Sequence, residues 1–286
     1  MKKRVLIIGK ESKIGSSLIS GIDSTLYSIS YTTRRRQDIC DNTYFLNLES
    51  IDEFLKLNLS FEIVIICSAI SNNKVCNQNP VLAYDVNYAN TIRLVKYFSK
   101  KQSYIIIFST SQVIENFKDG REFYMQEQPS TIYGKTKYLL EQHLNLLNEK
   151  VCIIRSTKII DSKNELFQKW ILDLKNKNEI SPLKDIYFAP ISISFMIDLI
   201  IKCLLHEYVG LIEISAKSEI TYSYAAFYIA KKLDFDQKLI NPIFHRNTNL
   251  EYVPSNSILI SNVENYNMNP PIPEEALDFF VNNYEL

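Results

Sequence analysis

The stretch Val5-Leu6-Ile7-Ile8-Gly9-Lys10-Glu11-Ser12-Lys13-Ile14-Gly15 decides the fold. It begins with an apolar run of strand length, and a helical pattern covers residues 12–21. A strand that passes through a glycine turn into a helix offers backbone N–H groups to a dinucleotide pyrophosphate. Gly9 and Gly15 hold the first and last positions of a GxxGxxG pattern, and Ser12 replaces the middle glycine. Taken alone, the stretch also fits an ordinary strand-to-helix turn.

Outward from this stretch, apolar runs alternate with helical patterns through the first half of the 286-residue chain. Such βαβ repetition predicts an α/β fold with a Rossmann-type doubly wound parallel sheet. We place the sheet in residues 1–158, with strands added from the later chain, and a smaller C-terminal α/β substrate lobe in residues 159–286. The predicted strands are 5–8, 27–31, 44–46, 63–67, 105–108, 151–155 and 211–215. The predicted helices are 12–21, 51–57, 80–100, 130–148, 163–175, 193–207 and 223–233.

Composition excludes several classes of protein. The 32 basic and 32 acidic residues cancel, so no overall field attracts nucleic acid or an anionic membrane. The five cysteines form no CxxC pair and the three histidines are far apart, which argues against a metal site. No apolar run approaches the roughly 18 residues of a membrane span, and the short run after Lys2-Lys3-Arg4 is no signal peptide. We therefore expect a cytoplasmic protein.

The end of the second predicted strand reads Thr32-Thr33-Arg34-Arg35-Arg36, with no carboxylate before Asp38. An acidic side chain at this place holds the ribose 2′-hydroxyl of NAD, whereas arginine accommodates the 2′-phosphate of NADP. Arg34 and Arg35 therefore favour NADPH, with NADH less favoured. The alternative is a solvated basic loop.

The sharpest chemical signal is Tyr133-Gly134-Lys135-Thr136-Lys137 at the start of a predicted helix. The spacing of four residues puts Tyr133 and Lys137 on one helical face. An ammonium beside a phenol stabilises the phenolate, so we expect Lys137 to lower the pKa of Tyr133. The pair can then exchange a proton with a carbonyl or hydroxyl group. A hydroxyl from residues 109–111, at the end of the fifth strand, can bind the same substrate oxygen.

These motifs together resemble the extended short-chain dehydrogenase/reductases, in the branch of the dTDP-4-dehydrorhamnose reductases. The resemblance covers most of the chain and is looser from Leu183 onward. The matching segments are Gly9 to Gly15, Asp85-Val86-Asn87, Phe108-Ser109-Thr110, Tyr133 to Lys137 with Glu141, and Ile153-Ile154-Arg155-Ser156-Thr157.

The resemblance implies a role for each matching residue. Tyr133 would be the proton donor, Lys137 would lower its pKa and hold the nicotinamide ribose, and Thr110 would orient the carbonyl. The residues implied to bind the cofactor are Gly9, Ser12, Lys13, Ile14, Gly15, Arg34, Arg35, Cys67, Ser68, Ala69 and Lys137.

Two further residues are candidates for substrate binding. Asn87 would belong to the network that supports the active site, or it is an amide on a helix face. Arg155 would face a substrate phosphate, or it closes a structural ion pair. Asp119-Gly120-Arg121, between Thr110 and Tyr133, covers the substrate or is only a turn.

Departures from the family pattern bear on the substrate. Ser111-Gln112 stands where relatives carry Asp-Tyr, and the Asp-Glu pair of the related dehydratases is missing, which argues against dehydration. The resemblance implies NADPH-dependent reduction of the 4-keto group of a nucleotide-activated deoxysugar, in surface polysaccharide biosynthesis. The alternatives are a sugar-nucleotide epimerase and a non-catalytic NADP-binding regulatory subunit. A homodimer is a further expectation from the family.

Overall fold

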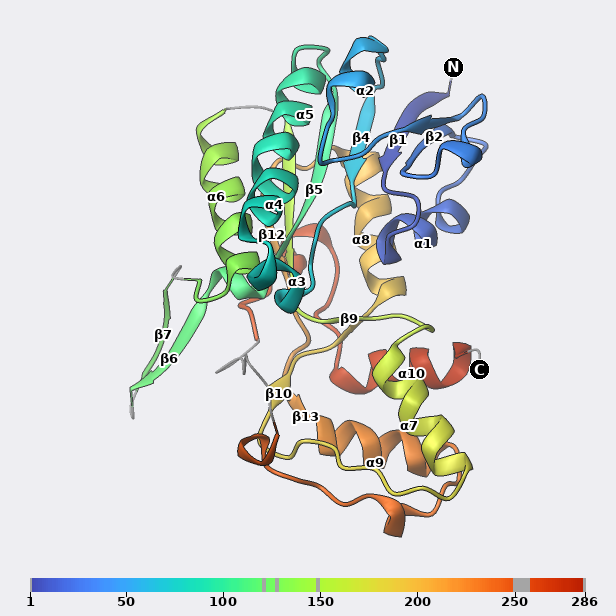
Figure 1. Cartoon of the computed structure of the whole chain (residues 1–286), viewed down its shortest axis with the longest axis vertical. Coiled ribbons are helices and arrows are strands. Elements are labelled where there is room, and N and C mark those ends of the chain that lie inside the picture. The colour runs from blue at the N-terminus through green and yellow to red at the C-terminus, as the bar shows by residue number, and fades with distance from the viewer. Residues whose placement is uncertain (1, 120–121, 127–128, 148–149, 249–257, 285–286) are drawn as a thin grey trace. The chain divides into compact units, whose positions relative to one another are not determined.

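The computed structural model describes the chain except for residues 1, 120–121, 127–128, 148–149, 249–257 and 285–286. Gly120 and Arg121, part of the loop considered above, thus lie outside the described residues. The chain divides into two compact units (Figure 1). Unit 1 comprises Met1–Ile114, Glu127–Arg155 and Ile197–Ile212, and unit 2 comprises Glu115–Gln126, Ser156–Met196 and Glu213–Leu286. The units alternate along the chain. The main boundary is predicted from the sequence at residue 158, with strands from the later chain added to the first part.

A seven-stranded sheet in the order β12-β8-β5-β4-β1-β2-β3 forms the centre of unit 1. Its strands are β1 (Lys3–Ile8), β2 (Tyr27–Thr33), β3 (Thr43–Phe45), β4 (Ile63–Ile66), β5 (Tyr104–Thr110), β8 (Val151–Ser156) and β12 (Gly210–Ile214). β1 pairs in parallel with both β2 and β4, and the β2–β3 and β4–β5 pairs are also parallel. The strand order reverses between β1 and β4, as in a doubly wound sheet. The predicted fold class is confirmed.

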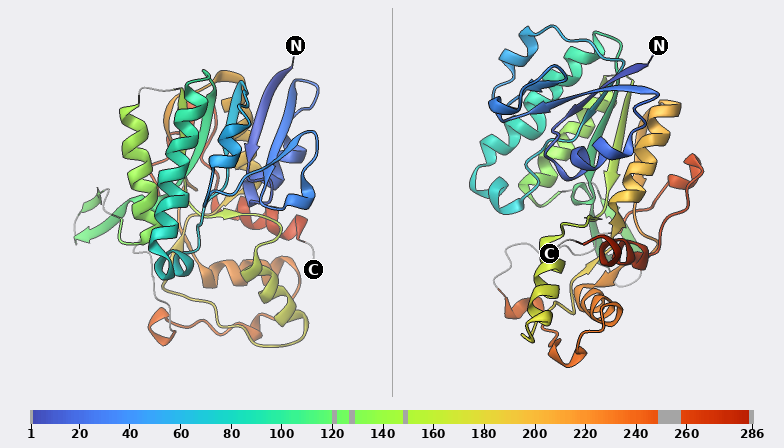
Figure 2. Two further views of the ribbon diagram at one scale, coloured as in Figure 1. Left: turned by 45° about the horizontal axis from the view of Figure 1, so that its top comes forward. Right: turned by 90° about the vertical axis from the view of Figure 1, so that its right-hand side faces the viewer.

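Helices cover both faces of this sheet. They are α1 (Lys13–Gly21), α2 (Asp52–Lys56), α3 (Asn73–Gln78), α4 (Pro80–Tyr84), α5 (Asn90–Ser99), α6 (Ile132–Leu146) and α8 (Ile193–His206). In Figure 2, α2, α5 and α6 lie over one face and α1 and α8 over the other. A Cβ built on Gly21 of α1 would lie 2.7 Å from the Cγ2 atom of Ile197 in α8, so these two helices are in close contact.

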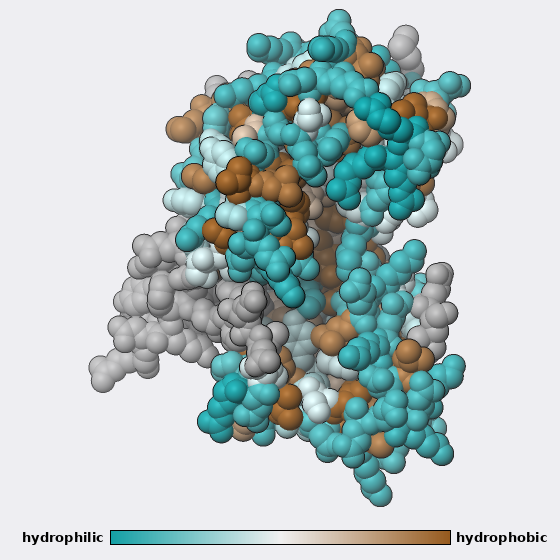
Figure 3. All heavy atoms as spheres, viewed as in Figure 1, coloured by the Kyte–Doolittle hydropathy of each residue, from teal (hydrophilic) through white to brown (hydrophobic). Residues whose placement is uncertain are grey.

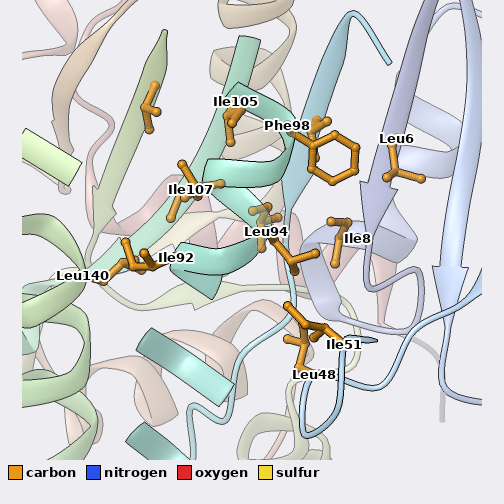
Figure 4. Close-up of a cluster of buried hydrophobic side chains, with 14 of the residues drawn as sticks. Leu6, Ile8, Leu48, Ile51, Ile92, Leu94, Phe98, Ile105, Ile107 and Leu140 are labelled. Atoms are coloured by element: carbon orange, nitrogen blue, oxygen red, sulfur yellow. The ribbon is translucent and has the colours of Figure 1, made fainter. Parts of the chain in front are cut away.

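The core of unit 1 is apolar from the middle of the sheet to the helices above it. Leu6 and Ile105 on the strands and Leu94 and Phe98 on α5 are completely buried, as Figure 4 shows. Each side chain of this size contributes about 1.5–3 kcal/mol when it leaves water. This buried core therefore holds the sheet, and the residues at the carboxyl ends of its strands, in fixed positions.

The helix predicted for residues 80–100 is interrupted in the structure. α4 runs into a π-helical turn over Asp85–Ala89, and α5 follows. The hydroxyl of Thr91 donates to the carbonyl of Val86 at 2.8 Å, which satisfies a backbone group inside this turn. π-helical turns occur often at functional sites, and this one carries Asn87.

Unit 2 has its own core. It contains β6 (Glu115–Asp119), β7 (Glu122–Gln126), β9 (Ile159–Ile160), α7 (Glu165–Lys175), β10 (Tyr187–Phe188), β11 (Ile191–Ser192), β13 (Ile220–Thr221), α9 (Tyr222–Lys232) and α10 (Pro273–Asn283). Phe167 lies between Trp170 and Phe280, with ring centroids 5.2 Å from each. All three rings are buried, so Trp170 is a core residue, as the sequence analysis expects.

The surface carries mixed side chains. On the face shown in Figure 3, hydrophilic residues predominate and apolar ones gather in small groups. Among the described helices, none combines the length and the apolar character needed to span a membrane.

Candidate active site

The turn after β1 is shaped by Gly9. Its φ angle is +95°, a conformation that side-chain-bearing residues rarely adopt. Its N–H donates to the hydroxyl of Thr32 at 2.9 Å, and a Cβ at this position would lie 1.9 Å from the Oγ atom of Ser68. Only glycine therefore fits where the ends of β1, β2 and β4 meet.

Ser12 occupies the middle glycine position without disrupting the turn. It is the N-cap of α1, where its hydroxyl accepts from the N–H of Gly15 at 3.0 Å and donates to the carbonyl of Gly9 at 2.9 Å. Serine is among the favoured N-cap residues for this reason. Lys13, Ile14 and Gly15 form the first turn of α1, the end of a helix that favours an anion.

A cavity of about 260 Å³ lies at the carboxyl ends of the strands of unit 1. It brings together five of the predicted cofactor-binding residues, Gly9, Ser12, Arg34, Ser68 and Ala69. A second cavity, of about 330 Å³, is lined by Glu11, Arg34, Arg35, Phe45, Asn47 and Glu49. Cys67 directly follows β4, and burial raises the pKa of its thiol, so it is an uncharged residue of the same strand end.

The three consecutive arginines have different surroundings. Arg36 forms an ion pair with Glu53 at 2.7 Å, and its guanidinium lies 3.8 Å from the ring centre of Phe45. Arg34 and Arg35 line the second cavity instead. Arg34 and Arg35, the two arginines that the sequence analysis expects to bind the 2′-phosphate, thus both line a cavity beside the end of β2.

The sequence analysis missed a third strand end that contributes to both cavities. Leu46, Asn47, Leu48 and Glu49 follow β3 and line the first cavity, and Asn47 and Glu49 also line the second. The sequence held a signal for this contribution. The strand over residues 44–46 was predicted to belong to the parallel sheet, and all strands of such a sheet end at the same edge. Ile70 and Val86, from the segments after β4, complete the lining.

Thr110 and Tyr133 belong to elements that pack closely. Thr110 ends β5, and its hydroxyl accepts from the N–H of Gln112 at 3.3 Å. Thr131 caps α6 and donates to the side chain of Gln112 at 2.9 Å. A Cβ on Gly134 would lie 2.3 Å from the Gln112 carbonyl oxygen. The glycine after Tyr133 therefore allows α6 to approach the turn that follows Thr110.

Lys137 is buried on α6 and points to the sheet. Its ammonium donates to the carbonyl of Phe108 at 2.9 Å, and only 5% of the residue is exposed. Burial lowers the pKa of Lys137 to about 8, although the nearby carboxylate of Glu141 opposes the decrease. The amine therefore changes charge within a pH range that assays can reach.

The expected lowering of the Tyr133 pKa is wrong. Tyr133 packs in a buried cluster with Cys76 and Ala83. Burial raises the pKa of Tyr133 above its ordinary value, and Cys76 adds to the increase. Loss of solvation disfavours the charged phenolate relative to the neutral phenol. Tyr133 is consequently a neutral phenol with a proton to donate.

Arg155 is held by an ion pair inside unit 1. Its guanidinium binds both carboxylate oxygens of Glu141, and the side chains are 4% and 3% exposed. Of the two interpretations offered for Arg155, the structural ion pair describes it. Contact of Arg155 with the substrate is not supported, because the Nε and Nη2 donors of its guanidinium are directed to the Glu141 carboxylate.

Asn87 joins the segment after β4 to α6. Its side-chain oxygen accepts from the N–H of Ile70 at 2.8 Å, and its amide group donates to the carbonyl of Ile70 at 2.9 Å and to Thr136 at 3.3 Å. It is 1% exposed. Asn87 thus lies in a supporting network next to Tyr133 and Lys137, rather than at an open surface.

The histidines are engaged separately. His143 is 3.1 Å from the hydroxyl of Tyr88, and His245 is 2.7 Å from Asp185. Within the described part of the chain, no three His, Cys, Asp or Glu residues are grouped so that they could hold a metal ion.

Several solved structures of nucleotide-sugar enzymes have a fold similar to that of this chain. The dTDP-4-dehydrorhamnose reductase of Bacillus anthracis in complex with NADP is 22% identical, with a TM-score of 0.84 over 98% of this chain and 99% of that chain. The reductase of Yersinia enterocolitica is 18% identical, with a TM-score of 0.83 over 99% and 100%. The UDP-N-acetylglucosamine 4-epimerase of Methanobrevibacter ruminantium is 15% identical, with a TM-score of 0.79 over 99% and 98%. No curated protein matches the sequence.

A family model gives the more specific result. The RmlD substrate binding domain matches residues 2–285, which is nearly the whole chain. The chain therefore belongs to the RmlD substrate binding domain family, and the family and the enzyme class expected from its motifs are confirmed.

Proposed function

We propose that this protein uses NADPH to reduce the 4-keto group of a nucleotide-activated deoxysugar. The observation that carries the proposal is the set of Thr110, Tyr133 and Lys137, held by β5 and α6 in the unit that also contains the cavity at the strand ends. A proton donor and a carbonyl-binding hydroxyl beside a dinucleotide fold are the parts that a ketone reductase needs.

The residues around the cavity suit the adenosine end of NADPH. The positive φ of Gly9 closes the turn, the first turn of α1 suits the pyrophosphate, and Arg34 with Arg35 suits the 2′-phosphate. Lys137 would hold the nicotinamide ribose. When bound, the cofactor supplies a hydride to the substrate carbonyl carbon.

The protein's own side chains account for the proton. Thr110 donates a hydrogen bond to the carbonyl oxygen and fixes its position. As negative charge develops on that oxygen, the neutral phenol of Tyr133 transfers its proton there. The ammonium of Lys137 favours this transfer because it stabilises the phenolate that is left behind. The ketone thereby gains a hydride and a proton and becomes an alcohol.

The substrate class rests on the family and its relatives. The family is defined by a substrate binding domain, and the similar structures include dTDP-4-dehydrorhamnose reductases and UDP-sugar epimerases. A nucleoside diphosphate linked to a sugar is common to all of these. The 4-keto-6-deoxysugar follows from the reductases among them. The pathway, the cellular location and the homodimer stay predictions.

The test is a turnover assay with matched variants. The purified protein is given NADPH and a panel of nucleotide 4-keto-6-deoxysugars, and oxidation is followed by absorbance. Tyr133→Phe should reduce turnover by about 100- to 10,000-fold while NADPH binding is kept. Tyr138→Phe, on the same helix, is the control and should leave turnover unchanged.

Other outcomes favour the alternatives. Tightly bound NAD in the purified protein, with interconversion of sugar isomers and no net oxidation, would favour an epimerase. NADPH binding without turnover on any sugar would favour a regulatory subunit. Equal turnover in Tyr133→Phe and the unmodified protein would contradict the proton-donor role.

A further inference from the structure

A carboxylate stands at the end of β2, although no acidic residue belongs to that strand end. Glu11, from the turn after β1, accepts a hydrogen bond from the hydroxyl of Thr33 at 2.5 Å. Thr33 is the last residue of β2 and is 1% exposed. The same hydroxyl oxygen accepts from the N–H of Arg35 at 3.1 Å. Two hydrogen bonds at the Thr33 hydroxyl, one from the Arg35 N–H and one to Glu11, thus hold the carboxylate of Glu11 in place.

The end of β2 matters for the cofactor because the adenosine ribose binds there in folds of this kind. In doubly wound nucleotide-binding folds, a carboxylate at the end of the second strand accepts a hydrogen bond from the adenosine ribose. Here the neutral Thr33 occupies the strand end, and its hydroxyl donates a hydrogen bond to the carboxylate of Glu11. The acidic group is supplied by a different segment but reaches the same strand end.

Glu11 also shares its space with the arginines. Both Glu11 and Arg34 line the two cavities, and Arg35 lines the second. Asp38, the first acidic residue after β2, lines neither of these two cavities, and one of its carboxylate oxygens is 3.8 Å from the ammonium of Lys10. The site therefore presents opposite charges to whatever group is attached to the ribose 2′ position.

The two forms of the cofactor respond differently to these charges. A 2′-phosphate is attracted by Arg34 and Arg35 and repelled by Glu11. A free 2′-hydroxyl can donate a hydrogen bond to the carboxylate and does not need the arginines. We infer that Glu11 sets the cofactor preference, an inference that rests on the cofactor site of the proposed function. Glu11 lowers the affinity for NADPH relative to NADH and lets NADH bind in the same site.

The experiment measures binding and needs no substrate. Fluorescence titration gives the dissociation constants of NADPH and NADH, and calorimetry with 2′,5′-ADP and 5′-AMP isolates the adenosine end. Glu11→Gln removes the charge from an exposed side chain and should raise the NADPH-over-NADH affinity ratio by about ten-fold. Thr33→Val keeps the charge but removes its anchor, and should raise the ratio by a smaller factor.

Glu49→Gln is the matched control, because Glu49 lines both cavities but follows β3 instead of joining the end of β2. It should change the ratio less than Glu11→Gln does. An unchanged ratio in Glu11→Gln, or an equal change in Glu49→Gln, would overturn the inference while the proposed reductase stands. Failure of the unmodified protein to bind NADPH or NADH would overturn both.

Discussion

The guanidinium of Arg155 on β8 and the carboxylate of Glu141 on α6 form a two-point ion pair with almost no exposure to solvent. Glu141 is one helical turn beyond Lys137, and its charge raises the pKa of that lysine against the effect of burial. The pair thus joins a strand of the sheet to the helix that carries the proposed catalytic residues.

Removing one partner of this pair should destabilise the protein strongly. Arg155→Met leaves a buried carboxylate without its partner, which we expect to lower the free energy of unfolding by about 3–5 kcal/mol. The measurement is urea unfolding followed by circular dichroism.

The double variant Glu141→Leu with Arg155→Met is the control for that loss. Because both charges are gone, it should recover most of the stability of the unmodified protein. A double variant as unstable as the single one would show that the ion pair is not the cause.

Turnover should depend on pH through Lys137. Its pKa is about 8, so the ammonium that stabilises the Tyr133 phenolate is present below this pH and is lost above it. We expect the turnover rate to be steady toward neutral pH and to fall as the pH rises through about 8.

Stopped-flow measurement of a single turnover from about pH 6 to about pH 10, roughly two units on either side of that value, tests this expectation. Lys135→Met, which alters an exposed lysine of the same helix, should keep the profile. A rate that stays constant to the alkaline end of the range would exclude Lys137 as the titrating group.

Gly134 should tolerate no side chain. In Gly134→Ala the new Cβ would lie 2.3 Å from the backbone oxygen of Gln112, so α6 must move away from the turn after Thr110. We expect a loss of about 1–3 kcal/mol in the free energy of unfolding and a marked loss of turnover. Thermal unfolding and the sugar reduction assay measure the two effects.

Gly21→Ala is the matched helical variant. Its Cβ would lie 2.7 Å from the Cγ2 methyl of Ile197, which is a side-chain atom and not a backbone oxygen, so Ile197 must shift. Alanine favours a helix over glycine by about 1 kcal/mol, which offsets part of this cost. The stability of Gly21→Ala should therefore fall less than that of Gly134→Ala, and turnover should be kept. Equal losses of stability and turnover in the two variants would contradict the specific role of the close contact between Gly134 and the Gln112 backbone.

The sheet was predictable because its central strands are continuously apolar. β1, β4 and β5 follow the predicted runs within a few residues, and the glycine turn lies where the pattern placed it. The predicted helix over residues 80–100 was less accurate, since apolar spacing does not distinguish an α-helix from one with a π-helical turn. α3 was missed because its polar sequence, NKVCNQ, has no amphipathic period.

The site was predictable where chemistry follows local sequence. Gly9, Arg34, Tyr133 and Lys137 were found from their neighbours along the chain. The hydrogen bonds and ion pairs around the site could not be found in this way, since Glu11 meets Thr33 and Glu141 meets Arg155 only in the folded chain. The direction of the Tyr133 pKa likewise depends on burial against Cys76, a residue of the helix that the pattern missed.

The place of β12 in the sheet has a consequence for synthesis of the protein. This strand, Gly210–Ile214, lies next to β8 at the end of the sheet, although residues 157–209 come between them along the chain, and residues 157–196 of that segment belong to unit 2. Until the ribosome has released β12, β8 presents unpaired backbone groups to other chains. Shortened forms that stop soon after β8 should therefore aggregate, and a complete nucleotide-binding unit cannot be expressed as a simple N-terminal fragment.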